Sequence, residues 1–214
     1  MNELNDFYNV VDSRRTVREY KEKVIPIETI RNILDCGFKA PSNDHTRRWE
    51  FILIDDINTK TMILGEKGEN NLKPIDPQKV IDDWSFEFKD KLQKEVYFTS
   101  IPIQAQMILT APVVLVPCFF QPRPLLSPTQ LRHLNYFASI WMCIENILLA
   151  AAAKGIFGVT MIPNKPQNIK TLLNIPEKYE MACLLPLGYP RENAWVPRQY
   201  EIQIEERIRM NSWD

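Results

Sequence analysis

Apolar residues recur at regular spacings in the first quarter of the chain and predict a helix, a loop and a strand. The helix opens at Pro26, and its apolar residues fall three or four positions apart: Ile27, Ile30, Ile33, Leu34 and Phe38. Pro41 stops this helix, and the Ser-Asn-Asp run that follows favours a loop. Residues 49–54 then have the composition of a strand.

Beyond residue 110 the apolar runs are longer and predict a buried core. Residues 112–120 form a continuous apolar run of strand length, which indicates a strand covered on both faces. Residues 129–154 predict a long helix that Gly155 ends. Because apolar residues circle most of this helix, we expect it to be buried in the domain, in a dimer interface, or in both. Shorter elements follow, namely a strand at 156–162, a helix at 166–173 and a strand at 181–187.

Two segments differ from this core pattern. Residues 55–99 are more polar, and a surface helix is expected at 78–96. A long excursion of this kind, at about residues 65–100, forms either a lid over a substrate or plain surface structure, and the pattern leaves both open. Residues 195–214 are rich in charge with isolated apolar residues, which predicts an extended C-terminal arm that packs on another surface.

Composition predicts one ordinary globular domain, residues 1–214. The 214 residues are 45% hydrophobic and 25% charged, with a formal net charge of -1, so no global charge attracts nucleic acid or an acidic membrane. The first ten residues contain no apolar stretch of a signal peptide, and Glu145 and Asn146 interrupt the longest apolar run. We therefore expect a cytoplasmic protein that binds neither nucleic acid nor membranes. The order of elements lacks regular strand–helix alternation, which favours an α+β fold.

The cysteines do not predict a metal site. Cys36, Cys118, Cys143 and Cys183 lie far apart among apolar neighbours, and the chain has two histidines, His45 and His133. Without a CxxC pair these residues do not make a convincing zinc set, and no metal is expected. We expect the four cysteines to be buried thiols in a reducing compartment.

The sharpest local feature is the basic run from Ser13 to Tyr20, with the sequence SRRTVREY. If it is extended, Arg14, Thr16 and Arg18 share one face, because strand side chains alternate. Two guanidinium groups and a hydroxyl suit a phosphate, although a solvated basic strand would have the same sequence. The chain contains no GxGxxG, no P-loop motif and no GxSxG motif, so dinucleotide-binding, P-loop and hydrolase sites are not supported.

Taken in chain order, several segments resemble those of the nitroreductase family of FMN enzymes. These are the Arg-Arg-Thr-Val-Arg run, the helix at 24–38, the Ala-Pro-Ser loop at 40–42 before Trp49, the NILLAAAAKG helix at 146–155, and LPLGYP at 185–190 followed by Pro197-Arg198. The likeness spans about residues 10–200. His45-Thr46-x-x-Trp49 and the segment from Met181 to Pro190 are most similar to the deiodinase-like branch.

The resemblance implies a fold, an assembly and a site. The fold would be a nitroreductase-like α+β fold with a mixed, mostly antiparallel central sheet flanked by helices, in an intertwined homodimer with an extended C-terminal arm. Arg14, Arg15 and Thr16 would hold the FMN phosphate and ribityl chain, with Arg198 as a further phosphate contact. Arg18 would reach the pyrimidine edge of the flavin. Two segments would line the ring: Pro41, Ser42 and Asn43 from the partner subunit, and Thr160, Met161 and Ile162 with a donor near N5.

The chain departs from the family pattern in three places. Arg47 and Arg48 stand where many members have Gln-Pro, and they would either attract an anionic substrate or cofactor phosphate or be plain surface charge. Residues 65–95 show no match to the Glu, Tyr and Lys with which deiodinases hold an amino acid, which argues against a halotyrosine substrate. Ile162 aligns with a deiodinase threonine near N5, which leaves a backbone donor there and favours two-electron hydride transfer.

The expected function is NAD(P)H-driven, two-electron reduction of a nitroaromatic, quinone or activated alkene by FMN, with ping-pong kinetics. No side chain is expected to be catalytic, because flavin N5 carries the chemistry. Two alternatives stay open. One is a different flavin chemistry, such as reductive dehalogenation or flavin breakdown, and the other is an FMN-binding protein that stores or senses the cofactor without turnover. A homodimer is expected independently, because the apolar long helix and the C-terminal arm both need an external surface.

Overall fold

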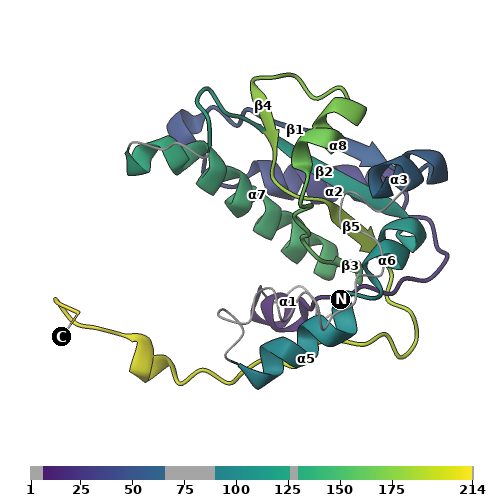
Figure 1. Ribbon diagram of the computed structural model, residues 1–214. Helices are drawn as coiled ribbons and strands as arrows, with labels where there is room; N and C mark the ends of the chain where they lie inside the picture. Colours follow the sequence, from purple (N-terminus) through teal and green to yellow (C-terminus); the bar gives the residue numbers. More distant parts are fainter. Residues whose placement is uncertain (1–6, 66–89, 126–129, 214) are drawn as a thin grey trace.

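A central antiparallel sheet carries helices on both faces in the computed structural model, which describes residues 7–65, 90–125 and 130–213 (Figure 1). The strands follow the order β1 (Trp49–Ile54), β2 (Val113–Phe120), β5 (Leu185–Gly188) and β3 (Phe157–Gly158). β4 (Tyr179–Met181) also pairs with β2, next to β5. Every named strand pair is antiparallel, and an isolated bridge from Thr16 to Gly158 adds a parallel contact. The α+β class expected from the sequence is confirmed.

β2 is the middle of the molecule, and its two faces contribute to two different cores. Val113, Leu115 and Phe119 belong to one hydrophobic cluster. Val114, Val116 and Cys118 belong to the other. The alternation follows from the two-residue period of a strand, and the burial of both faces explains why the sequence run is apolar throughout.

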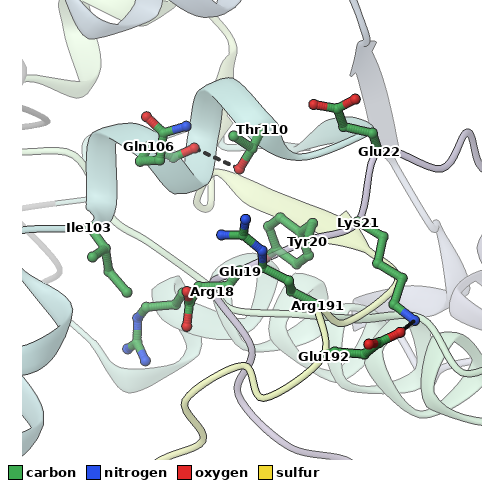
Figure 2. Close-up of a pocket in the computed structure, with 10 residues that line it drawn as sticks. All are labelled: Arg18, Glu19, Tyr20, Lys21, Glu22, Ile103, Gln106, Thr110, Arg191 and Glu192. Atoms are coloured by element: carbon green, nitrogen blue, oxygen red, sulfur yellow. Dashed lines mark hydrogen bonds and ion pairs between the residues drawn. The ribbon is translucent and has the colours of Figure 1, made fainter.

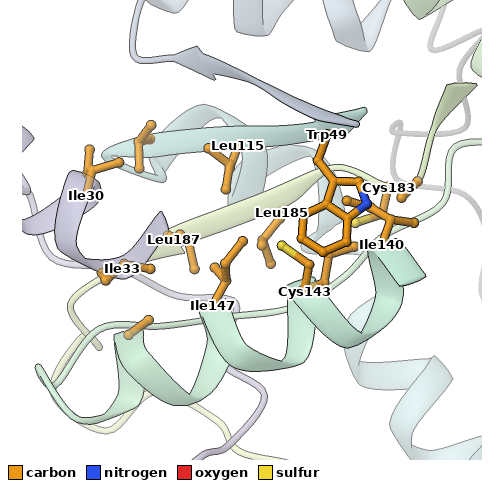
Figure 3. Close-up of a cluster of buried hydrophobic side chains, with 14 of the residues drawn as sticks. Ile30, Ile33, Trp49, Leu115, Ile140, Cys143, Ile147, Cys183, Leu185 and Leu187 are labelled. Carbon is orange, nitrogen blue, oxygen red and sulfur yellow. The ribbon is translucent and has the colours of Figure 1, made fainter. Parts of the chain in front are cut away.

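The first core lies between the sheet and two packed helices, α2 (Ile27–Phe38) and α7 (Asn135–Ala152) (Figure 3). Ile30 and Ile33 of α2 pack with Ile140, Cys143 and Ile147 of α7 in this cluster. A Cβ atom at Gly37 would lie 2.7 Å from the Ile147 side chain, so the two helices approach too closely there for a larger residue without movement.

The second core is covered by three short helices, α3 (Ile57–Leu64), α6 (Gln104–Thr110) and α8 (Pro166–Leu172). The sequence predicted α8 but not α3 or α6, since few apolar positions mark such short helices.

Asp56 begins α3 by accepting hydrogen bonds from the backbone N–H groups of residues 58 and 59. The buried Lys60 donates to the carbonyl oxygens of Asp55 and Ala111 at 3.1 and 2.7 Å, so its ammonium is satisfied.

The polar region between β1 and α6 holds a further helix, α5 (Lys91–Ser100). Asp90 caps it by accepting from the backbone N–H groups of Leu92 and Gln93. The surface helix expected at 78–96 is wrong at its C-terminal end, because α5 continues to Ser100. Residues 78–89 of that prediction, and most of the expected lid, lie outside the described residues.

Three other element boundaries differ from the sequence prediction. The helix expected at 129–154 is a 3-10 turn, η3 (Leu131–Leu134), followed by α7, and Gly155 ends it with a positive φ of 68°. The strand expected at 181–187 is split into β4 and β5, because Leu184 turns to exchange backbone hydrogen bonds of 2.8 and 2.9 Å with Met161. The strand expected at 156–162 is also shorter than predicted. Continuous strand pairing covers residues 157–158, and Met161 pairs with Leu184 as an isolated bridge.

The two chain ends lie away from the sheet. α1 (Phe7–Ser13), which the sequence did not predict, lies against α7. After residue 195 the chain extends from the body, with one 3-10 turn, η4 (Ile204–Arg207) (Figure 1). Its large apolar side chains are exposed, including Ile202, Ile208, Met210 and Trp213. The described residues therefore form the predicted arm, and these side chains have no cover within the chain's described part.

Residues Leu131–Ala152 are long and apolar enough to cross a membrane, by length and composition alone. In the fold, one face of α7 is buried and includes Ile140, Ile144 and Ile147. This face packs on α2 and β2. A core helix of a soluble protein has the same length and composition, and the packing fits the core helix predicted from the sequence.

The expectation of four buried cysteines is wrong for Cys36. That residue lies on the outer face of α2 and is exposed, while Cys118, Cys143 and Cys183 are buried. Burial raises the pKa of each buried thiol to about 12, so little thiolate forms at neutral pH.

We therefore expect a thiol titration with Ellman's reagent at pH 8 to show one fast-reacting thiol per native chain. The three buried cysteines should react after denaturation, because their thiols are both inaccessible and protonated. Cys36→Ser is the matched variant and should remove the fast phase. Two or more fast thiols in the native protein would contradict this packing.

Candidate functional site

The basic run is held in an extended conformation against the edge of the sheet. Thr16 pairs with Gly158 of β3, and the backbone N–H of Val17 donates to the Gly158 oxygen at 3.4 Å. The Val17 side chain points inward and is buried in the second core. Arg14, Arg15, Thr16 and Arg18 are all half-buried.

Gly158 permits this close approach. A Cβ atom there would lie 2.2 Å from the carbonyl oxygen of Pro186, which belongs to the backbone of β5 and cannot move independently. Glycine is therefore the residue that fits between β5 and the basic run. The position of Thr16, and of the arginines on either side of it, depends on this contact.

The first two arginines of the run have different surroundings. Arg14 faces Glu145 of α7, with a separation of 3.8 Å between Nε and Oε1. Because this contact is long, most N–H groups of the Arg14 guanidinium remain available to a ligand. Arg15 donates through Nη2 to the carbonyl oxygen of Pro197 at 2.6 Å, which places the exposed Arg198 next to the basic run. Arg15 thus ties the start of the C-terminal arm to the site.

Arg18 is the most unusual charge of the run. Its Nη1 atom is buried and has no hydrogen-bond partner among the described residues. Burial lowers the pKa of the guanidinium, and the nearby Tyr20 and Tyr97 partly offset this effect. A buried donor without a partner is costly, so the arrangement favours an acceptor supplied by a ligand.

Residues 160–162 lie just beyond Gly158, on the same side as the basic run. Met161 uses both backbone groups to pair with Leu184. Because backbone groups alternate along an extended segment, the N–H groups of Thr160 and Ile162 point away from Leu184. The Ile162 side chain is 64% exposed. This edge therefore presents backbone donors and an apolar side chain to a ligand.

Pro41, Ser42 and Asn43 are placed elsewhere in the same chain, at the start of α7. Asn43 donates its backbone N–H to Ser139 Oγ at 2.9 Å and accepts from Asn135 Nδ2 at 3.2 Å. Arg14, in contrast, faces Glu145, which lies six residues beyond Ser139 along α7, about 9 Å of helix. One chain therefore brings together the basic run, residues 160–162 and Arg198, and holds the Pro-Ser-Asn loop apart from them.

A cavity of about 630 Å³ lies beside Arg18, between the chain at 18–22 and α6 (Figure 2). Ile103, Gln106 and Thr110 line it from the α6 side, and Arg191 and Glu192 close it. Of the site residues predicted from the sequence, Arg18 alone lines this cavity. Lys21 and Glu192 form an ion pair of 3.4 Å there, which neutralises part of its charge.

Sequence reasoning missed Tyr97 and Gln106, which reach the surroundings of Arg18 from α5 and α6. The polar character of residues 55–99 gave no indication that Tyr97 approaches a buried arginine. The sequence analysis predicted no helix at 104–110, and without that helix Gln106 could not be placed beside Arg18.

Comparisons with known proteins identify the family and the fold. The model of the nitroreductase family matches residues 11–189. An iodotyrosine deiodinase of Nematostella vectensis is 28% identical over 204 residues, which are 94% of this chain and 73% of that protein.

Two solved structures show the same fold. A crystal structure of oxidised iodotyrosine deiodinase bound to FMN and 3-iodo-L-tyrosine has a TM-score of 0.72 at 21% identity, covering 97% of this chain and 100% of that one. Nitroreductase A from Vibrio parahaemolyticus has a TM-score of 0.69 at 17% identity, covering 98% and 78%. The expected nitroreductase-like fold is confirmed. With its family match across most of its length, the chain belongs to the nitroreductase family.

Proposed function

We propose that this chain binds FMN and is an FMN-dependent oxidoreductase. The observation that carries the proposal is the buried Nη1 of Arg18, which no described residue pairs with, four residues along the chain from the half-buried Arg14. Two fixed cations on one face fit a ligand with a phosphate at one end and an acceptor-rich ring at the other. The residues present therefore fit FMN.

In this proposal the basic run holds the cofactor along its length. Arg14 and Thr16 bind the phosphate and ribityl chain, with Arg198 as a further phosphate contact. Arg15 contributes by fixing Pro197, beside Arg198. Arg18 donates to the pyrimidine edge of the ring, where a permanent positive charge stabilises added negative charge.

The edge at residues 160–162 supplies donors to the central part of the ring. Met161 is paired with Leu184, so the backbone N–H groups of its neighbours, Thr160 and Ile162, point to the other side. We propose that one of these two N–H groups donates to flavin N5. When bound, FMN supplies the hydride acceptor and donor at N5, so the chain needs no catalytic acid–base side chains of its own. The Ile162 side chain, which is exposed in the single chain, would cover that position once FMN is bound.

We further propose a homodimer in which the Pro41–Asn43 loop lines the partner's flavin. Within one chain this loop contacts the first residues of α7, whereas Arg14 contacts Glu145 further along the same helix. Because the loop is held away from its own chain's basic run, we propose that it serves the site of a second subunit. The exposed apolar side chains of the arm also need a surface to cover them. A flavin-loaded monomer in sedimentation velocity would contradict this assembly.

The proposed reaction is two-electron reduction of a nitroaromatic, quinone or activated alkene, with NADH or NADPH as donor. Donor and acceptor would use the same open face in turn, so steady-state kinetics with menadione or nitrofurazone should give parallel lines in double-reciprocal plots. A protein that carries bound flavin but turns over with neither donor would be an FMN-binding protein without this activity. A cytoplasmic location stays a prediction.

Reductive dehalogenation is a second candidate, because the Nematostella relative is an iodotyrosine deiodinase. The segment in which an amino-acid clamp was sought lies mostly outside the described residues, so it does not separate the two candidates. The test is release of iodide from 3-iodo-L-tyrosine by the dithionite-reduced, FMN-loaded protein, measured beside nitrofurazone reduction. Iodide release without reduction of nitrofurazone would favour the dehalogenase.

A further inference from the structure

Arginine side chains gather around the start of α7, outside the site described above. We define the basic cluster as Arg48, Arg123, Arg132 and His133. Arg48 precedes β1, Arg123 follows β2, and the other two belong to η3. The arginines are exposed, and His133 is half-buried.

Arg48 is held in a fixed orientation. Its guanidinium lies over the ring of Phe120, with Cζ 3.2 Å from the ring centroid, and the Phe120 N–H donates to the Arg48 oxygen at 3.0 Å. A guanidinium stacked on an aromatic face keeps its N–H edge available for an anion. The neighbouring Arg47 behaves differently, because its Nε donates to the Phe38 oxygen at the end of α2 at 2.9 Å. Arg47 is therefore structural, and Arg48 is left for a ligand.

Arg123 and His133 meet next to this stack. Arg123 Nη1 lies 3.2 Å from His133 Nε2, and Gln121 Nε2 holds the Arg123 carbonyl oxygen at 2.7 Å. The pKa of His133 is lowered by burial and by the charges of Arg123 and Arg132, so a neutral ring accepts from Arg123. Tyr136, one turn beyond His133, packs edge-on against Phe120 with ring centroids 5.8 Å apart. The contact between Phe120 and Tyr136 therefore joins the ring under Arg48 to the start of α7, directly after the turn that carries His133.

Three carboxylates lie on neighbouring described segments. Glu180 pairs with Lys170 at 2.8 Å, which offsets its charge. Asp44 accepts from the Asn43 side-chain amide at 2.8 Å, which is a neutral partner, and Glu50 on β1 is exposed. The three arginines of the cluster outnumber these last two carboxylates and leave a local excess of positive charge.

The cluster adjoins the loop at 41–43, which the proposed function places over the partner's flavin. Asn43 contacts Asn135 and Ser139 of α7, immediately after η3, and Ser42 Oγ accepts from the Arg47 N–H at 3.2 Å. An anion bound at the cluster would therefore lie at the margin of the flavin's open face. This step rests on the proposed function.

We infer that the basic cluster binds the phosphate groups of the electron donor, a reduced nicotinamide dinucleotide. Arg48 and Arg123 contact phosphate oxygens, and Arg132 adds long-range attraction. The Phe120 ring holds the Arg48 guanidinium, and His133 holds that of Arg123, before the ligand arrives, which lowers the entropic cost of binding.

The test is calorimetric titration of the FMN-supplemented full chain with 2′,5′-ADP, and with adenosine as the ligand without phosphate. We expect 2′,5′-ADP to bind at least about tenfold more tightly than adenosine, with an affinity that falls as salt is added. Arg48→Gln and Arg123→Gln should each weaken 2′,5′-ADP binding on the order of three- to tenfold and leave adenosine unchanged. The matched control is Arg31→Gln on the outer face of α2, which should change neither. Arg48→Lys, which keeps the charge without the planar stack, should give an intermediate loss.

The inference is overturned if 2′,5′-ADP binds no better than adenosine, or if Arg31→Gln causes the same loss as the cluster variants. Its failure is distinguishable from failure of the proposed function, because this titration does not depend on flavin chemistry. Reoxidation of the photoreduced, FMN-loaded protein by menadione, without any nicotinamide present, should be equal in wild type, Arg48→Gln and Arg123→Gln, while the KM for NADPH rises in both variants. If menadione is reduced but the variants titrate like wild type, the inference fails alone.

Discussion

Replacing Arg14 by alanine is expected to weaken FMN binding about 10- to 100-fold. A hydrogen bond to a charged group contributes about 1.5–3 kcal/mol, and each 1.4 kcal/mol is a factor of ten in affinity. Arg14 is half-buried, and its contact to Glu145 is a long 3.8 Å, so the side chain is held close to the proposed phosphate position without being neutralised. The measurement is quenching of FMN fluorescence during titration of the apoprotein.

Arg31→Ala is the control for Arg14→Ala, because Arg31 pairs with Glu28 on the exposed surface of α2. This variant should bind FMN like wild type. An Arg14→Ala protein with unchanged FMN affinity would remove Arg14 from the site, and equal losses in both variants would mean that net charge alone attracts the cofactor.

Gly158→Ala is expected to lower the free energy of unfolding by about 2–3 kcal/mol and to weaken FMN binding as well. The new Cβ would lie 2.2 Å from the Pro186 oxygen and 2.8 Å from Leu187 Cδ2, so β3 or β5 must shift. A shift of β3 breaks its bridge to Thr16, and the arginine-bearing segment moves with it. Urea unfolding and FMN titration of the same variant measure the two effects.

Gly155→Ala separates backbone strain from steric conflict. Gly155 has a positive φ of 68°, but a Cβ there meets no atom within 4 Å. We expect a loss of about 1 kcal/mol from the left-handed conformation and no change in FMN affinity. A Gly158→Ala protein as stable as wild type would show that the basic run is not held by the close contact at Pro186.

The sequence predicted the elements whose burial pattern is strong. The helix at 27–38 and the strand at 49–54 were found within a residue of their observed ends. The helix buries regularly spaced apolar positions, whereas the strand was found from its composition and buries Trp49 and Ile54 at its two ends. The short helices α3 and α6 were missed, since both depend on tertiary packing more than on their own periodicity, and α3 also depends on its Asp56 cap. The break between β4 and β5 depends on the bridge from Leu184 to Met161, which no local pattern reveals.

The candidate site was predictable in part. The alternation that would put Arg14, Thr16 and Arg18 on one face is a local property of an extended chain and stays a prediction, although the burial of Val17 between Thr16 and Arg18 fits it. The pairing partner Gly158, the tie from Arg15 to Pro197 and the approach of Tyr97 to Arg18 are contacts between distant segments. Arg47 and Arg48 looked equivalent in sequence, and their different partners, a helix-terminal carbonyl and an aromatic ring, separate them.

The most direct test of the central claim is the visible absorbance spectrum of the purified protein after incubation with FMN and removal of unbound ligand. The account predicts flavin absorbance maxima that stay with the protein at close to one FMN per chain, and release of free FMN on denaturation. A colourless protein that does not retain added FMN would contradict it.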